Sequence, residues 1–150
     1  PLIAPGLISQ VARLLNTRPD ADIATLCESI TSVEDLFDPG VVKVVRDENE
    51  MALYFSRAPI PWHRESFAKQ PVKLPSAQKY FRHLGIYAYR VSYLLDFVVS
   101  EMSSIELTES LEQLRALYHG GKIVVAEALE QSGPGVDTEK DLERVRKLIG

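Results

Sequence analysis

The sequence has little cysteine, no excess of positive charge and no long hydrophobic run. Its single cysteine, Cys27, cannot form an internal disulfide, and no group of His and Cys shows the spacing of a zinc site. Seventeen Lys and Arg against twenty-one Asp and Glu leave a net charge of -4, so we expect no basic surface for nucleic acid or an anionic membrane. No stretch approaches the roughly 20 apolar residues of a membrane helix, and no signal peptide opens the chain. These absences predict a cytoplasmic protein with neither nucleic acid nor membrane as a partner.

Motifs for nucleotide binding and for serine hydrolysis are also absent. The patterns G-x-x-x-x-G-K-[ST], G-x-G-x-x-G and G-x-S-x-G do not occur in the 150 residues. We therefore expect no autonomous nucleotide site. What is present is an ordinary composition, 45% hydrophobic and 25% charged, which is typical of a globular domain with one buried core.

Strand patterns alternate with helical patterns along the chain, which predicts an α/β fold with a mixed sheet. Residues 64–79 combine charges and prolines with few apolar anchors, so we expect a surface excursion there. In chain order the sequence predicts a helix around 7–15, a strand near 24–27, a short helix capped by Ser32, a hairpin of strands 41–46 and 51–56, a strand at 80–90, a helix at 92–99, a longer helix capped by Ser104 with Leu107, Leu111, Leu114 and Leu117 on one stripe, a strand at 122–128, and a last helix at 138–149.

The aromatic strand at 80–90 carries the first candidate site. Alternation places His83, Gly85, Tyr87 and Tyr89 on one face. Such a face is polar and open enough to contact a hydroxylated ligand. The alternative interpretation is a half-buried structural histidine.

Two further groups of residues could carry chemistry. Arg57 ends an apolar strand just before a Pro-x-Pro segment, where its guanidinium could meet a carboxylate or phosphate. The alternative is a surface arginine paired with a glutamate. Glu106, Glu109 and Glu112 recur at every third position, with Gln113 four residues past Glu109. Three acids on one stripe are most often a solvated face.

Asp137 follows a Gly-Pro-Gly-Val loop and stands where the last helix is expected to begin. Aspartate is a preferred N-cap, so the residue could serve the helix alone. It could equally be a metal-binding carboxylate delivered at the end of a strand, where α/β sheets place ligands. The sequence leaves both interpretations open.

Four strings, taken together, are more specific than any single residue. They are YFSRAPIPW at 54–62, RHLGIYAYR at 82–90, LEQLRAL at 111–117 and GVDTEKDLERV at 135–145. Their order and spacing resemble the CMP-Kdo synthetases, the 3-deoxy-manno-octulosonate cytidylyltransferases of Gram-negative bacteria. The similarity covers essentially the whole sequence.

The resemblance implies a fold, an activity and an assembly. The fold is a Rossmann-like α/β nucleotidyltransferase, of which residues 1–150 form the C-terminal part of a single domain. The activity couples CTP to the sugar acid Kdo with release of pyrophosphate, depends on Mg²⁺ and feeds lipopolysaccharide assembly. A homodimer is expected through residues 41–100, and the aromatic strand beginning at Tyr80 is expected to expose apolar surface for it.

The resemblance also implies the site residues. It places Arg57, His83, Tyr87, Glu112 and Gln113 around the sugar acid. Of these, Arg57 and His83 would offset the carboxylate of Kdo, and the other three would exchange hydrogen bonds with its hydroxyl groups. The catalytic residue and magnesium ligand implied by the resemblance is Asp137.

Family members reach a Gln-Gly-Asp-Glu-Pro string about a hundred residues into their chains, and Pro1 resembles its last residue. The sequence therefore resembles the C-terminal three-fifths of the family, without the N-terminal nucleotide-binding part. We expect the 150 residues alone not to turn over CTP. Two alternatives remain, a CMP-sialic acid synthetase and a catalytically silent module for sugar-acid binding and dimerisation.

Overall fold

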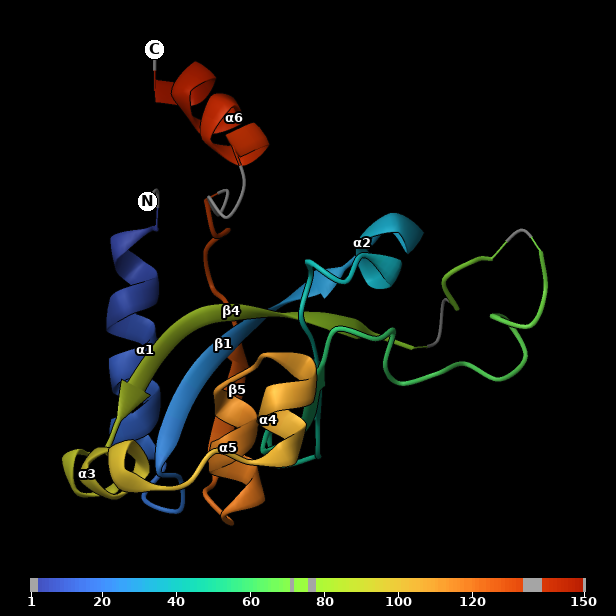
Figure 1. Ribbon diagram of the computed structural model, residues 1–150. Helices are drawn as coiled ribbons and strands as arrows, with labels where there is room; N and C mark the ends of the chain where they lie inside the picture. The colour runs from blue at the N-terminus through green and yellow to red at the C-terminus, as the bar shows by residue number, and fades with distance from the viewer. Residues whose placement is uncertain (1–2, 71, 76–77, 134–138, 150) are drawn as a thin grey trace.

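A computed structural model describes residues 3–70, 72–75, 78–133 and 139–149. Its centre is a five-stranded sheet with the strand order β3-β2-β4-β1-β5 (Figure 1). Strand β1 (Ile23–Ile30) pairs in parallel with β5 (Ile123–Glu127) and antiparallel with β4 (Tyr80–Tyr89). Strand β2 (Lys43–Arg46) pairs antiparallel with β4 and with β3 (Ala52–Ser56). The predicted α/β class and mixed sheet are confirmed.

Helix α1 (Pro5–Thr17) covers one face of this sheet (Figure 1). Proline suits the first turn of a helix because its missing N–H would have no partner there. The buried residues Leu7, Val11 and Leu15 recur at intervals of four and form one stripe. They pack in one apolar cluster with Ala24 of β1 and Val124 of β5.

The opposite face is covered by two short helices, α4 (Ser104–Glu109) and α5 (Gln113–Tyr118) (Figure 1). Leu114 and Ala116 of α5 pack in a second cluster with Ile23 and Cys27 of β1. Because side chains of a strand alternate between its two faces, β1 contributes Ala24 and Leu26 to one cluster and Ile23 and Cys27 to the other.

The prediction of one long helix after Ser104 is wrong. The chain breaks at Ser110, whose φ of 53° is left-handed and ends α4. The cap is also one residue earlier than expected, because Ser103 and Glu106 form a reciprocal capping box. Leu107 is 61% exposed and lies outside the apolar stripe.

Three further helices lie at the periphery: α2 (Val33–Phe37), α3 (Val91–Val99) and α6 (Glu139–Ile149). Ser32 caps α2 by accepting a hydrogen bond from the amide of Asp35, as predicted. Among the described residues, no helix is long and apolar enough to cross a membrane.

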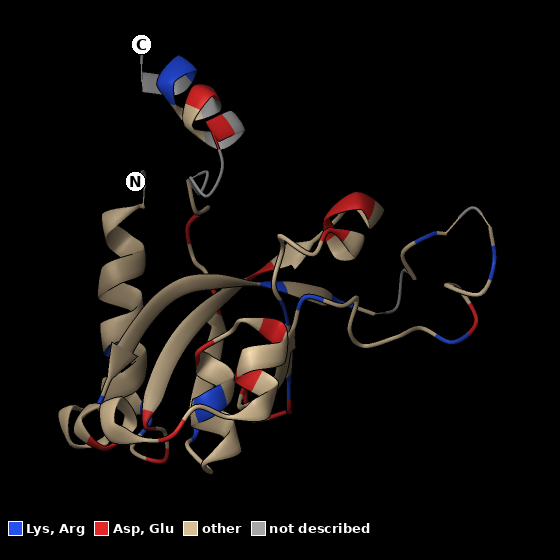
Figure 2. Ribbon diagram, in the orientation of Figure 1, with Lys and Arg blue, Asp and Glu red and all other residues tan. Residues whose placement is uncertain are grey.

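The described parts of the predicted surface segment, 64–79, contain no helix or strand, and neither do residues 57–63 before it. Basic residues are distributed along this segment, whereas α2 carries acidic residues (Figure 2). One apolar anchor was missed, because Phe67 is buried and packs with Ile30, Leu36 and Tyr80. Trp62 packs edge-on against Phe67 but stays largely exposed.

The β2–β3 hairpin bends so that its tip reaches the outer edge of β5. The amide of Val125 donates to the carbonyl oxygen of Glu50, and Met51 forms an isolated bridge with Val124. The guanidinium of Arg46 donates to the carbonyl oxygen of Val125 at 2.7 Å. The two ends of the sheet are therefore brought together.

A bulge interrupts the pairing of β1 with β4. Thr25 lies opposite Tyr87, whereas the next residue, Leu26, lies opposite Leu84. Two residues of β4, 85 and 86, thus have no partner in β1. Because the insertion has an even number of residues, the alternation of β4 is preserved across it.

Candidate functional site

A short series of polar and aromatic side chains lies on the sheet face covered by α5. The rings of His83 and Tyr87 are 5.2 Å apart, and those of Tyr87 and Tyr89 are 5.7 Å apart. Tyr87 and Tyr89 pack against the same apolar cluster as Leu114 of α5. The predicted shared face is confirmed. The expectation that this strand exposes its aromatic side chains is wrong, because both tyrosines pack against the core.

Thr25 belongs to this site and was missed by the sequence analysis. Its side chain is completely buried on the same face of β1 as Cys27. Its Oγ1 lies 2.9 Å from Nε2 of His83. The signal in the sequence was a hydroxyl residue within an otherwise apolar strand. It can be interpreted only once the partner strand and its register are known.

His83 is neutral at physiological pH. Burial of its ring, which packs edge-on against Phe55 at 5.0 Å and beside Tyr87, lowers its pKa to about 4. A neutral imidazole can donate one hydrogen bond and accept one. Without a ligand it therefore carries no charge that could offset a carboxylate, and the expected role of His83 toward the carboxylate of Kdo stays a prediction.

The phenol of Tyr87 stays protonated. Burial raises its pKa, and the nearby charge of Glu112 together with Tyr89 raises it further. Burial also raises the pKa of Tyr89, with Glu112 and Tyr93 adding to the increase and Arg115 opposing it. These phenols are thus hydrogen-bonding groups and not bases at neutral pH.

The start of α5 brings the predicted pair Glu112 and Gln113 to this region. Glu112 is exposed and is close enough to Tyr87 for its charge to act on the phenol. Gln113 is only 2% exposed. A primary amide can both accept hydrogen bonds from a polar ligand and donate them to it.

Arg57 lies at the end of β3, beside the connection between α4 and α5. Its guanidinium donates to the carbonyl oxygens of Glu109 at 2.8 Å, Pro39 at 2.9 Å and Ser110 at 3.4 Å. Three of its five N–H groups are thus occupied by the main chain. It is neither the free guanidinium nor the simple surface ion pair considered from the sequence. The N–H groups left over can still bind an anion.

The acidic stripe is not a solvated face. Glu106 is buried within the capping box of α4. The carboxylate of Glu109 accepts hydrogen bonds from the Ser56 hydroxyl at 2.6 Å and the Arg57 amide at 2.9 Å. Only Glu112 is exposed as expected. Glu109 therefore fastens α4 to the end of β3, whereas Glu106 caps α4 and pairs with Arg115 of α5.

The predicted magnesium ligand, Asp137, lies outside the described residues. Within the described part of the chain, no group of three or more His, Cys, Asp or Glu could hold a metal ion. Mg²⁺ is often held by only one or two carboxylates together with substrate phosphates, so the role of Asp137 stays a prediction.

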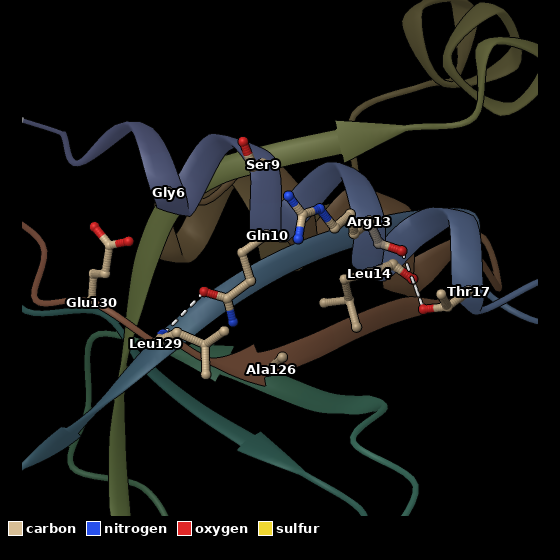
Figure 3. Close-up of a pocket in the computed structure, with 9 residues that line it drawn as sticks. All are labelled: Gly6, Ser9, Gln10, Arg13, Leu14, Thr17, Ala126, Leu129 and Glu130. Atoms are coloured by element: carbon tan, nitrogen blue, oxygen red, sulfur yellow. Dashed lines mark hydrogen bonds between the residues drawn. The ribbon is translucent and has the colours of Figure 1, made fainter.

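A shallow pocket of about 460 Å³ lies on the opposite side of the sheet (Figure 3). It is formed by α1, by Ala126 of β5 and by the chain that follows this strand. The side-chain amide of Gln10 crosses it, donating to the carbonyl oxygen of Glu127 and accepting from the amide of Leu129. The pocket therefore lies apart from His83 and Tyr87 and contains none of the predicted site residues.

Comparisons with known proteins agree on one family. A family model described as "Cytidylyltransferase" matches residues 1–123. The chain is 57% identical to a 3-deoxy-manno-octulosonate cytidylyltransferase of Nitrosococcus oceani, over 99% of this chain and 58% of that protein. It is 55% identical to the protein of the same name from Pseudomonas fluorescens (strain SBW25), over 100% of this chain and 59% of that protein.

Among solved structures, the chain is similar to a CMP:2-keto-3-deoxy-manno-octonic acid synthetase complexed with CTP. The TM-score is 0.84 and the identity is 38%, over 99% of this chain and 57% of that one. The chain thus spans a little under three-fifths of the length of the relatives it matches.

Proposed function

The chain belongs to the cytidylyltransferase family, among its CMP-Kdo synthetases, and from this premise we propose that it acts in the CTP-dependent activation of Kdo. The reaction would join CMP to the sugar acid and release pyrophosphate, and its product would serve lipopolysaccharide assembly. The described residues would contribute the part of the site that binds the sugar acid.

The observation that carries this proposal is the cluster of polar side chains beneath α5. Kdo has several hydroxyl groups and one carboxylate. Neutral His83 and Tyr87, together with the side-chain amide of Gln113, match hydroxyl groups. The remaining N–H groups of Arg57 match the carboxylate, because guanidinium is the one permanent cation among the predicted site residues.

Binding of the sugar acid by the 150-residue chain tests this proposal. Kdo is added to the chain, and its affinity is compared with that of N-acetylneuraminate by calorimetry. We expect Kdo to bind more tightly, and His83→Asn to weaken Kdo binding about tenfold, since one or two hydrogen bonds are lost. Equal or tighter binding of N-acetylneuraminate would favour the CMP-sialic acid synthetases instead.

Pyrophosphate release from CTP and Kdo tests the catalytic part separately. The sequence contains no phosphate-binding loop motif, so we expect the 16.8 kDa chain alone to give no turnover. Turnover by a chain of confirmed mass would contradict that expectation and require a new assignment of the nucleotide site.

We propose Asp137 as a magnesium ligand because the family resemblance implies this role. Asparagine caps helices about as well as aspartate, so Asp137→Asn separates the two interpretations. We expect the variant to unfold like the wild type but to bind Mg²⁺ at least tenfold more weakly, because a neutral amide replaces an anionic oxygen on a hard cation. Unchanged Mg²⁺ affinity would return Asp137 to a capping role.

A homodimer is also proposed, now with a different surface. Helix α3 exposes a continuous apolar strip that includes Val91, Leu95, Val98 and Val99, the last 81% exposed. Exposed strips of this kind are typical of protein contacts. We expect light scattering to give a dimer and Leu95→Lys to give a monomer. Leu107→Lys, at a similarly exposed position of α4, is the control.

A further inference from the structure

The hydroxyl group of Thr25 has more neighbours than it can serve as a donor. Its Oγ1 lies 2.8 Å from the carbonyl oxygen of Ile86, 3.1 Å from that of Leu84 and 2.9 Å from Nε2 of His83. A hydroxyl group has one hydrogen and two lone pairs. Since the side chain of Thr25 is completely buried, these contacts have to be satisfied within the protein.

The donors and acceptors around Thr25 determine which ring nitrogen of His83 carries the hydrogen. Carbonyl oxygens only accept, so those of Leu84 and Ile86 already compete for the single hydroxyl hydrogen of Thr25. If Nε2 lacked a hydrogen, a third acceptor would face the same hydroxyl, and buried lone pairs would oppose one another at about 3 Å. If Nε2 carries the hydrogen, it donates to a lone pair of Oγ1. That arrangement leaves only the two carbonyls sharing one hydrogen.

The ring is neutral, because burial lowers its pKa to about 4, and therefore has only one N–H. With that hydrogen on Nε2, the lone pair is on Nδ1. No residue in the described ranges makes a hydrogen bond with Nδ1 of His83. An unprotonated Nδ1 attracts the hydrogen of a hydroxyl group and repels a carboxylate oxygen.

The bulge explains why a threonine performs this task. The carbonyl groups of Leu84 and Ile86 flank Gly85, at the point where β4 has two residues without partners in β1. The two carbonyls share the single hydrogen of the Thr25 hydroxyl at the point where the ladder between β1 and β4 is interrupted. The same oxygen thus fastens the bulge and orients the neighbouring ring, while Phe55 and Tyr87 limit the rotation of that ring.

We propose that Thr25 is a positioning residue for sugar-acid binding, which holds His83 with its Nε2–H directed at the sheet and its Nδ1 presented to a hydroxyl group of the ligand. The identity of the ligand rests on the proposed function, whereas the hydrogen position on His83 does not. As a consequence, His83 binds a hydroxyl group of the sugar acid, whereas Arg57 binds its carboxylate.

Nitrogen-15 NMR of the histidine-labelled chain tests the hydrogen position directly. His83 is assigned by comparison with His83→Asn, and long-range proton–nitrogen correlations report which nitrogen is protonated. We expect Nε2 protonated and Nδ1 unprotonated at neutral pH. Thr25→Val removes the acceptor with little change of shape and should give a mixture of both tautomers. Thr25→Ser keeps the hydroxyl and should retain the wild-type pattern.

Addition of Kdo tests the role toward the ligand. We expect the Nδ1 resonance of His83 to shift while this nitrogen stays unprotonated. Kdo affinity should fall roughly tenfold in Thr25→Val, as expected when a pre-oriented hydrogen bond is lost, and stay within about twofold in Thr25→Ser.

Two results would overturn the proposal. One is a wild-type His83 that carries its hydrogen on Nδ1, or on both nitrogens, with or without Kdo. The other is a Thr25→Val variant whose tautomer and Kdo affinity are both unchanged. If Kdo does not bind the wild type, yet the tautomer depends on Thr25 as expected, the proposed ligand is contradicted and the positioning of His83 by Thr25 is supported.

Discussion

The two faces of the central sheet are built from the same strands but have different compositions. The face beneath α1 buries aliphatic side chains, among them Leu26 of β1 and Val124 of β5. The face beneath α5 has an apolar cluster too, but it also carries the buried side chains of Thr25 and Gln113 and the half-buried imidazole of His83. Strand alternation alone separates these two sets. One strand can therefore hold the fold with its even-numbered residues while it orients polar groups with its odd-numbered ones.

The difference has an energetic meaning. Aliphatic packing is non-directional, so its stabilisation depends on buried area. The hydrogen bonds of Thr25 depend on the register of β4 and on the bulge. Loss of an aliphatic side chain beneath α1 should therefore reduce stability without changing the orientation of the polar side chains. Substitutions beneath α5 should instead change their hydrogen bonds first.

The largest effect is expected from Leu26→Ala on the α1 face. Leu26 is completely buried, and such truncations typically cost 2–5 kcal/mol, so we expect a loss of about 3 kcal/mol in urea unfolding. The hydrogen position on His83, measured by NMR, should stay as in the wild type. A changed tautomer would show that the two faces are coupled.

A second effect concerns pH and the α5 face. The pKa of His83 falls from its ordinary value near 6.5 to about 4 on folding, so the unfolded chain binds more protons between these values. Stability therefore rises with pH across this window. The contribution of His83 is fully present above about pH 6.5 and is lost as the pH falls toward 4. Since one pKa unit is worth about 1.4 kcal/mol, the loss is at most about 3 kcal/mol.

Unfolding free energies of the wild type and His83→Asn at several pH values check this linkage. The difference between the two proteins should shrink as the pH falls from 6.5 to 4. A constant difference would mean that His83 titrates normally in the folded chain.

A smaller effect is expected at the helix that covers the polar face. Ser103→Ala removes the side-chain half of the α4 capping box and should cost about 1 kcal/mol. Ser104→Ala, one residue later and exposed, is the matched control and should change stability by less than about 0.5 kcal/mol. Thermal unfolding of both variants compares them. A larger loss in Ser104→Ala would restore the cap predicted from the sequence.

The smallest effect is expected from Gly85→Ala in the bulge. A Cβ at this position meets no atom within 4 Å, and its φ is not left-handed. We expect a change of less than about 1 kcal/mol, in the stabilising direction, because alanine reduces the freedom of the unfolded chain. Urea unfolding measures this. A loss above 1 kcal/mol would show that the bulge itself requires glycine.

The sequence predicted the strands of the sheet well, because their apolar alternation has few competing interpretations. It also predicted that His83 and Tyr87 share a face, and this survived the bulge only because two residues, and not one, are inserted. It failed where the outcome depends on a single backbone conformation or a distant partner. The left-handed Ser110 splits one expected helix into two, and no local pattern reveals that Arg57 binds the carbonyl groups of Pro39 and Ser110.

The contact between the hairpin tip and β5 has a consequence for solubility. An apolar strand at the border of a sheet offers unpaired N–H and C=O groups to any passing chain and is a common starting point for aggregation. In β5, both main-chain groups of Val125 that face this border are already bound, the amide by Glu50 and the carbonyl by Arg46. The hairpin tip thus covers the exposed edge of β5. Loss of this contact would leave the edge free to pair with a strand of another chain, which is a route to polymerisation.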